Sequence, residues 1–457
     1  MKKYQKLKNP LLFGTLLLTA SGVLCRVIGF LYRIFLSRTI GAKELGIYQL
    51  VFPISVLLLS LCSSGIQTAI SNFVAGRNAK KDNSLPSSRC IFGVGFLFAG
   101  TLSVLFTLLL WNNADFFAEL LLDDIAYSDH LRIVALYTVP ASVHACIDGF
   151  YYGKKQAVVP SLSQFLEQLG RVVGVYIIHL VVSENGGTLS AAHALWGLVI
   201  GELFGLLTGL ISFYFLPGVG RAASHPRSLR EKAMSLQKAA GEALRFAPRM
   251  LAYSVPLMFN HTLLHLCSCA ENMMIPGQLQ RYGYSSSQSL EIFGILSGMV
   301  ISVIFFPCVL TNSMSVLLLP AISEAKAVGD ADKIHSYVRR SVVYGLLIGF
   351  FFTLAFLCTG HFIGDILFDN ATAGSMICRL SWICPFLFVH SLFSGILQGL
   401  GKVGQVLFIN ILSFGIRVGA LFLLVPAYGE AALMWGMILA QFFCVVADLF
   451  TVWKIRI

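Results

Sequence analysis

The stretch LLFGTLLLTASGVLCRVIGFLYRIF, residues 11–35, is apolar except for two arginines, Arg26 and Arg33. Such a run is typical of a helix that crosses a membrane, because about 20 apolar residues span the hydrocarbon core. A cation at that depth costs roughly 3 kcal/mol, so it normally faces a protein interior or a water-filled path. The stretch therefore predicts a membrane helix that lines a polar cavity.

The rest of the chain has the same character. Of its 457 residues, 56% are hydrophobic and only 12% are charged, whereas soluble proteins carry about 25% charged residues. We therefore predict an all-α polytopic membrane protein. The pattern of apolar runs predicts about twelve spans, near residues 11–36, 45–68, 90–111, 131–152, 159–182, 192–216, 246–270, 290–313, 341–361, 377–400, 403–426 and 431–453. We expect the second and eighth of these spans to continue as helix beyond the bilayer.

Lysine and arginine gather on one side of the predicted membrane. With the N-terminus in the cytoplasm, the inner segments hold 24 of them, the outer segments hold 5, and four arginines lie inside spans. This bias places both termini in the cytoplasm and the chain in the cytoplasmic membrane. Because Arg26 interrupts the first apolar run and no small-residue cleavage site appears, we expect the first span to stay uncleaved. The net charge of +11 is then an orientation signal and a contact with anionic lipid, so no nucleic-acid partner is expected.

The longest polar interruption, residues 217–245, separates six spans from six. We predict an N-terminal six-helix lobe over 1–216, a cytoplasmic linker over 217–245 and a C-terminal six-helix lobe over 246–457. Because six is even, both lobes share one orientation, which favours a parallel pseudo-twofold axis and a substrate site between the lobes, as in alternating-access transporters. Residues of the first half recur downstream at similar offsets: Gly46 and Gly294, Ile70 and Ile322, Gly149 and Gly395, Arg171 and Arg417.

The first span carries Gly22, Arg26, Gly29 and Arg33 on one helical stripe. Guanidinium groups suit phosphate, because their fork donates two hydrogen bonds at once. We predict that both arginines bind an anionic substrate in the cavity. For Arg33, snorkelling to the outer interface is the alternative.

The fifth span has a polar face that includes Gln164, Glu167 and Arg171. Glu167 and Arg171 have the spacing of a helical ion pair, so they either bind substrate or neutralise each other. The matching positions of the second half are Asn410, Ser413 and Arg417. Because serine replaces the acid there, we expect Arg417 to be freer to meet a ligand. The predicted substrate-binding set comprises the two arginines of the first span together with Gln164, Glu167, Arg171, Asn410 and Arg417.

Other ionisable groups lie in predicted spans without an obvious role. His261 and His265 share a polar stripe of the seventh span with Ser254, Ser268 and Asn272. We predict a cavity wall or a proton-linked element there and no metal site. Cavity or coupling candidates elsewhere are Asp148 and Glu202, and the remaining lone groups are His144, His390 and Asp448. Because neither a nucleotide-binding loop nor a hydrolase motif occurs, we expect no catalytic residues, no enzyme activity and no cofactor beyond a coupling Na⁺ or H⁺.

The segment GFYYGKKQAVVPSLSQFLEQLGR, residues 149–171, resembles oligosaccharide-lipid flippases of the multidrug/oligosaccharidyl-lipid/polysaccharide (MOP) exporter superfamily. Supporting stretches are RVIGFLYRIFLSRTIGA at 26–42, GIQTAISNFVAGRN at 65–78, LLLPAISEAKAVGD at 317–330 and ILQGLGK at 396–402. The resemblance implies two six-helix lobes in a V, and a cationic cavity to which Arg26 and Arg33 belong. It also implies export of polyprenyl-pyrophosphate-linked sugars such as a peptidoglycan precursor.

The chain departs from this superfamily pattern in two ways. Many relatives have fourteen spans rather than twelve, and Glu271 occupies a position of AENMMIP, residues 270–276, where aspartate is more usual. Two other functions remain open: a cation-coupled multidrug exporter, favoured by Asp148, Glu167 and Glu202, and a non-transporting envelope or spore assembly factor. The expected partners are a lipid-linked anionic sugar and membrane lipids, with a monomer as the default state.

The predicted topology can be tested with reporter fusions. Green fluorescent protein at the C-terminus should fluoresce, because it folds in the cytoplasm. Alkaline phosphatase inserted in the acidic outer segment near residues 115–129 should be active, because it requires an oxidising compartment. An active phosphatase at the C-terminus would contradict the orientation.

Overall fold

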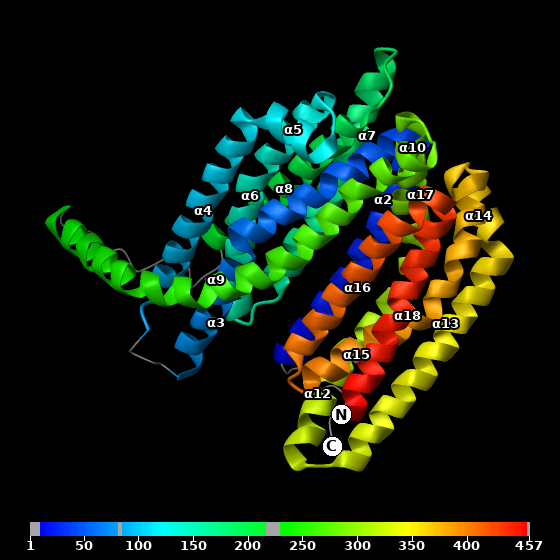
Figure 1. Cartoon of the computed structure of the whole chain (residues 1–457). Coiled ribbons are helices and arrows are strands. Elements are labelled where there is room, and N and C mark those ends of the chain that lie inside the picture. The colour runs from blue at the N-terminus through cyan, green and yellow to red at the C-terminus, as the bar shows by residue number, and fades with distance from the viewer. Residues whose placement is uncertain (1–9, 81–84, 216–228, 455–457) are drawn as a thin grey trace, which may run out of the picture. The chain divides into compact units, whose positions relative to one another are not determined.

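A computed structural model describes residues 10–80, 85–215 and 229–454, with side chains for 17–78, 85–215 and 240–454. Within these ranges the regular elements are helices (Figure 1). The earlier ones are α2 (Pro10–Leu59), the π-helical turn η1 (Ser60–Ser64), α3 (Gly65–Lys80), α4 (Ser88–Asn112), α5 (Ala114–Leu122), η2 (Ile125–Tyr127), α6 (Ser128–Gly153), α7 (Val158–Glu184) and α8 (Ala191–Phe215). The later ones are α9 (Leu229–Tyr282), α10 (Ser286–Gly294), the π-helical turn η3 (Ile295–Val300), α11 (Ile301–Phe305), α12 (Cys308–Val328), α13 (Ala331–Phe368), α14 (Ala371–Leu380), η4 (Ser381–Ile383), α15 (Cys384–Gly399), α16 (Val403–Leu423), α17 (Val425–Tyr428) and α18 (Glu430–Lys454).

The all-α polytopic fold predicted from the sequence is confirmed. Eleven helices of the described part are long and apolar enough to cross a membrane. The first of them, Leu17–Asn78, has 62 residues, or about 93 Å at 1.5 Å per residue, and it covers the first two predicted spans. The seventh predicted span lies inside α9. The eighth, residues 290–313, falls on two helices, Ser286–Phe305 and Cys308–Val328. The second span thus continues as helix to Asn78 as predicted, whereas the eighth is broken at Phe306–Pro307 before its continuation.

The chain divides into two compact units. The first unit contains Met1–Gly29 with Val51–Leu266, and the second contains Phe30–Leu50 with Cys267–Ile457. The boundaries fall inside α2 and α9, so each of these helices contributes to both units. Of the predicted linker 217–245, residues 217–228 lie outside the described residues. The predicted division into six-helix lobes stays a prediction.

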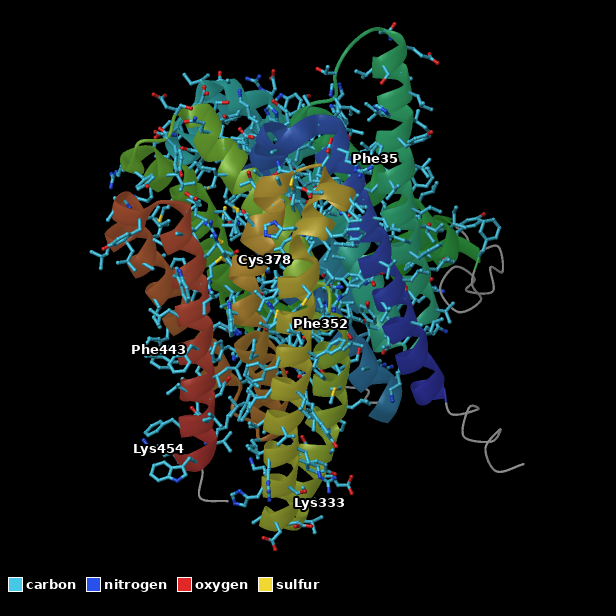
Figure 2. All side chains as sticks on the ribbon, turned by 90° about the vertical axis from the view of Figure 1, so that its right-hand side faces the viewer. Phe35, Lys333, Phe352, Cys378, Phe443 and Lys454 are labelled. Atoms are coloured by element: carbon cyan, nitrogen blue, oxygen red, sulfur yellow. The ribbon has the colours of Figure 1, made fainter. Side chains whose placement is uncertain are left out.

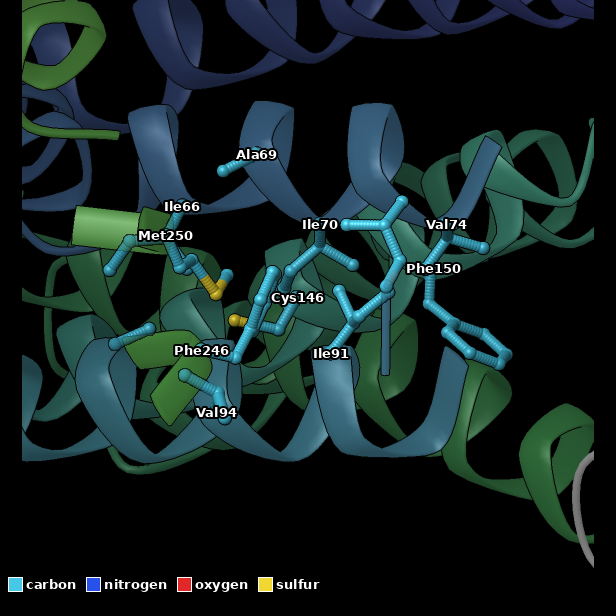
Figure 3. Packing of buried hydrophobic residues seen from close by; sticks show 12 residues of the cluster. Ile66, Ala69, Ile70, Val74, Ile91, Val94, Cys146, Phe150, Phe246 and Met250 are labelled. Atoms are coloured by element: carbon cyan, nitrogen blue, oxygen red, sulfur yellow. The ribbon is translucent and has the colours of Figure 1, made fainter. Parts of the chain in front are cut away.

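The first unit has an apolar core built from four helices (Figure 3). Ile70 of α3, Ile91 of α4 and Phe150 of α6 are buried at its centre, and Met250 of α9 closes it from a distant part of the sequence. This core needs tight helix packing, because lipid tails are as apolar as these side chains and supply no hydrophobic drive between helices. The packing therefore depends on small residues.

Glycines bring equivalent helices together in both units. A Cβ atom at Gly149 of α6 would lie 2.6 Å from the carbonyl oxygen of Gln67 in α3. A Cβ atom at Gly395 of α15 would lie 2.5 Å from the carbonyl oxygen of Ser315 in α12. The two glycines are 246 residues apart and their partners are 248 apart. The same helix–helix contact is thus built twice, which supports the internal repeat predicted from the sequence.

One of the predicted repeat matches is displaced by a turn. Val74 packs against Gly153, and Ile322 packs against Gly399. The packing therefore equates Ile322 with Val74, whereas the sequence match had paired it with Ile70. The sequence match chose Ile70 because it shares isoleucine with Ile322, whereas the residue in the equivalent contact, Val74, is a valine.

Another repeat pair meets face to face inside the second unit. A Cβ atom at Gly46 would lie 2.1 Å from the carbonyl oxygen of Leu290, and one at Gly294 would lie 2.0 Å from that of Ala42. The contact is reciprocal, since equivalent residues exchange equivalent neighbours. Reciprocity of this kind is the mark of a twofold relation, here between α2 and α10.

Two lysines mark one end of the second unit. Lys333 at the start of α13 and Lys454 at the end of α18 lie at the same end of this unit (Figure 2). Phe352 and Phe443 lie farther along the same two helices (Figure 2). Lysines at a shared helix end beyond an apolar middle are typical of one membrane interface.

Substituting the repeated glycines tests the packing. We expect Gly149→Ala and Gly395→Ala each to destabilise the folded chain by about 1–3 kcal/mol, because the added methyl group overpacks a backbone contact. Thermal unfolding in detergent measures this. Gly100→Ala in α4 is the control, because a Cβ there meets nothing within 4 Å. Equal melting temperatures for all three variants would contradict the packing described.

Candidate functional site

Helix α7 carries the ion pair predicted from the sequence. Arg171 Nη2 donates to Glu167 Oε1 at 2.7 Å, and both side chains are mostly buried. The two residues lie one turn apart, so the helix itself sets the geometry. Helix α8 approaches closely at Gly201, where a Cβ would lie 2.7 Å from the Glu167 carbonyl oxygen. The arginine is thus neutralised within its own unit.

Beside this pair, α6 and α8 are joined by a second polar contact. His144 Nδ1 lies 2.6 Å from Glu202 Oε1, and both side chains are buried. Asp148 Oδ1 lies 3.7 Å from His144 Nε2 and accepts a hydrogen bond from the Ser163 hydroxyl. Asp148 and Glu202, predicted as separate candidates, therefore belong to one cluster around His144.

The second unit repeats the histidine–carboxylate contact. His390 Nδ1 lies 2.6 Å from Asp448 Oδ2, joining α15 to α18. In both units the two partners are 58 residues apart, and each residue lies 246 positions after its counterpart. The sequence-based view of these groups as lone residues is wrong. The shared offset of 246, already used for Arg171 and Arg417, was the signal that could have paired them.

Arg417 has partners as well, so the expectation that it is freer than Arg171 is wrong. Its Nε donates to Glu271 Oε1 at 2.7 Å, and its Nη1 donates to the Ser413 hydroxyl at 2.9 Å. The serine that replaces the acid on α16 is itself a same-helix partner, and α9 supplies the missing carboxylate. A cavity of about 50 Å³ beside the pair is lined in part by Asn272 and Ser297. The sequence marked Glu271 only as an unusual residue.

The two arginines of the first span have different environments. Arg33 Nη1 donates to the Ser302 hydroxyl at 2.6 Å within the second unit. Arg26 belongs to the first unit and is exposed. Among the residues whose side chains are described, none forms a hydrogen bond or ion pair with the Arg26 guanidinium. Glycines on either side of it, Gly22 and Gly29, leave open space.

The remaining predicted site residues are spread over both units. Gln164 Nε2 donates to the Tyr152 hydroxyl at 3.3 Å in the first unit. His261 is exposed and His265 is half-buried on α9, while Asn410 is half-buried on α16 of the second unit. The two units thus hold separate polar clusters, one around His144 and one around Arg417.

Comparisons with known proteins agree with this architecture. A family profile described as polysaccharide biosynthesis protein matches residues 11–275, and one described as MatE matches residues 282–423. The chain is similar to stage V sporulation protein B of Bacillus subtilis (strain 168), with 23% identity over 438 residues, covering 94% of this chain and 82% of that protein. It is also similar to lipid II flippase MurJ of the same organism, with 23% identity over 425 residues, covering 87% and 74%.

Solved structures share the fold. An inward-facing multidrug resistance MATE family transporter of the MOP superfamily aligns with a TM-score of 0.68 at 12% identity, covering 94% of each chain. Lipid II flippase MurJ in an inward closed conformation aligns with a TM-score of 0.65 at 11% identity, covering 96% of this chain and 87% of that one. These relatives are transporters and flippases, not enzymes. The chain therefore belongs to the polysaccharide biosynthesis protein family of the MOP exporter superfamily and is a multi-pass membrane transporter.

Proposed function

We propose that this protein flips a polyprenyl-pyrophosphate-linked oligosaccharide or peptidoglycan precursor across the cytoplasmic membrane by alternating access. Two names support this substrate class: the relative lipid II flippase MurJ, and the family profile described as polysaccharide biosynthesis protein. In this mechanism the pyrophosphate and sugars cross through protein while the polyprenyl tail stays in lipid.

The observation that carries the proposal is the state of Arg26. It is an exposed cation in a membrane-spanning helix with no described partner. An unpaired charge at that depth costs roughly 3 kcal/mol, whereas an arginine–phosphate contact recovers energy through charge-assisted, bidentate hydrogen bonds. The open space at Gly22 and Gly29 leaves room for a diphosphate beside it. Arg26 is therefore the primary headgroup contact.

The other predicted residues support the headgroup less directly. Arg33 donates to the Ser302 hydroxyl, a neutral group. Arg171 and Arg417 are neutralised by Glu167 and Glu271, which weakens their attraction for an anion. Gln164 and Asn410 carry amides suited to sugar hydroxyls. Transport energy comes from the membrane potential or a Na⁺ or H⁺ gradient, at about 2.3 kcal/mol per charge per 100 mV.

A cation-coupled multidrug exporter is the second candidate, because the MatE profile matches residues 282–423. The first-unit carboxylates that could attract a cationic drug, Asp148 and Glu202, are almost fully buried. Their burial favours small cations over drugs. Clear drug efflux from cells that overproduce the chain, without flipping of a lipid-linked sugar in vesicles, would favour this candidate.

Replacing Arg26 tests the proposal. In vesicles with a fluorescent polyprenyl-pyrophosphate disaccharide, we expect Arg26→Ala to slow flipping about 10-fold or more, since a hydrogen bond to a charged group contributes about 1.5–3 kcal/mol. Arg26→Lys should retain an intermediate rate, because lysine keeps the charge and loses the fork. Arg379→Ala, at an exposed position of α14, is the control. Wild-type flipping by Arg26→Ala would refute the assignment.

The Arg417–Glu271 pair has its own test. Glu271→Gln alone should lower the melting temperature, because it leaves a partly buried guanidinium without its carboxylate. The double variant Glu271→Gln with Arg417→Gln should regain stability and flip near the wild-type rate. If instead this double variant is stable and inactive, Arg417 contacts the substrate, as the sequence predicted.

A further inference from the structure

The polar cluster of the first unit holds several nitrogen and oxygen atoms of the kind that bind metal ions. His144, Glu167 and Glu202 come from three different helices, α6, α7 and α8. Each offers one nitrogen or oxygen atom, and these atoms all lie within 4.8 Å of one another. Asp148 adds a further carboxylate on the other side of the imidazole, 3.7 Å from His144 Nε2.

The imidazole itself is incompletely bonded. His144 Nδ1 contacts Glu202, but within the described residues His144 Nε2 is buried and has no hydrogen bond. The side chain is only 6% exposed, and Nε2 itself is shielded from bulk solvent. A buried polar nitrogen without a partner is costly, and this one is aimed at a carboxylate just beyond bonding distance.

The charges of the cluster do not balance. Asp148, Glu167 and Glu202 are three carboxylates, and among the residues with described side chains the guanidinium that pairs with them is that of Arg171. With a neutral imidazole the formal sum is −2, which is expensive in a buried site. One divalent cation brings the sum to zero, whereas a monovalent ion leaves it negative.

The second unit has the equivalent residues with less negative charge. His390, Asp448 and Arg417 occupy the equivalent positions, but serines replace two of the acids: Ser394 for Asp148 and Ser413 for Glu167. With Glu271 the formal sum is −1, and a proton on His390 is enough to neutralise it. The surplus of carboxylate is therefore specific to the first unit.

We propose that the first unit binds one divalent metal ion through His144, Glu167 and Glu202, with Asp148 as a further ligand or as acceptor for the second imidazole nitrogen. One imidazole with carboxylates is a donor set for Mn²⁺, Fe²⁺ or Zn²⁺. The ion takes the place of the proton between His144 Nδ1 and Glu202. That proton moves to His144 Nε2, 3.7 Å from Asp148 Oδ1, so the imidazole stays neutral, and the ion ties α6, α7 and α8 together. The site does not depend on which lipid-linked sugar is carried.

Metal binding by the intact chain tests this site. The full-length protein, without a histidine tag, is purified in detergent, stripped with a chelator and equilibrated with Mn²⁺ or Zn²⁺. Bound metal is counted by mass spectrometry, and bound Mn²⁺ is followed by electron paramagnetic resonance. We expect one ion per chain and a higher melting temperature in the metal-loaded protein.

Matched variants of the two units separate this site from adventitious binding. Asp148→Ser with Glu167→Ser copies the serines of the second unit, and we expect it to weaken binding at least 10-fold while the chain stays folded. His144→Ala should abolish stoichiometric binding. His390→Ala, the equivalent change in the second unit, should leave it intact. Substoichiometric metal in the wild type, or equal binding by the serine variant, would overturn the proposal whether or not the protein flips a lipid.

Discussion

Burying a charge in a hydrocarbon layer is the constraint on which this structure depends. Each ionised side chain inside the bilayer needs an opposite charge, a set of hydrogen bonds or water. Arg171 and Arg417 meet this requirement through carboxylates of their own unit, and Arg33 through at least one hydroxyl. Arg26 has neither an ion pair nor a hydrogen bond among the residues described. Because an unpaired cation in a membrane-spanning helix is costly, Arg26 is the residue that points most directly to a function.

The internal repeat allows the polar residues of the two units to be compared position by position. Both units build the same glycine contacts and the same histidine–carboxylate bridge, so the shared residues are explained by the fold. The two units differ in the number and the source of their acidic residues. The first unit holds two extra acids, at Asp148 and Glu167, while the second takes its acid, Glu271, from α9. A duplicated frame with unequal charge suits a transporter whose two halves have different tasks.

Much of the fold could be predicted from the sequence, because hydropathy and the lysine–arginine bias report directly on membrane crossing. The Glu167–Arg171 pair was also accessible, since helical spacing alone brings the two side chains together. Contacts between helices were not. Glu271 reaches Arg417 across 146 residues, and His144 reaches Glu202 across 58. Such pairs depend on which helices pack side by side. In the sequence, only the shared repeat offset indicated the histidine–carboxylate pairs of the two units.

Binding of the lipid-linked headgroup tests the central claim most directly. Native mass spectrometry of the intact chain with a polyprenyl-pyrophosphate disaccharide reports affinity without requiring transport. The account predicts that Arg26→Ala binds this lipid at least 10-fold more weakly than the wild type does. Inorganic pyrophosphate should displace the lipid from the wild type but not from Arg26→Ala. Equal affinity of both proteins for the lipid would contradict it.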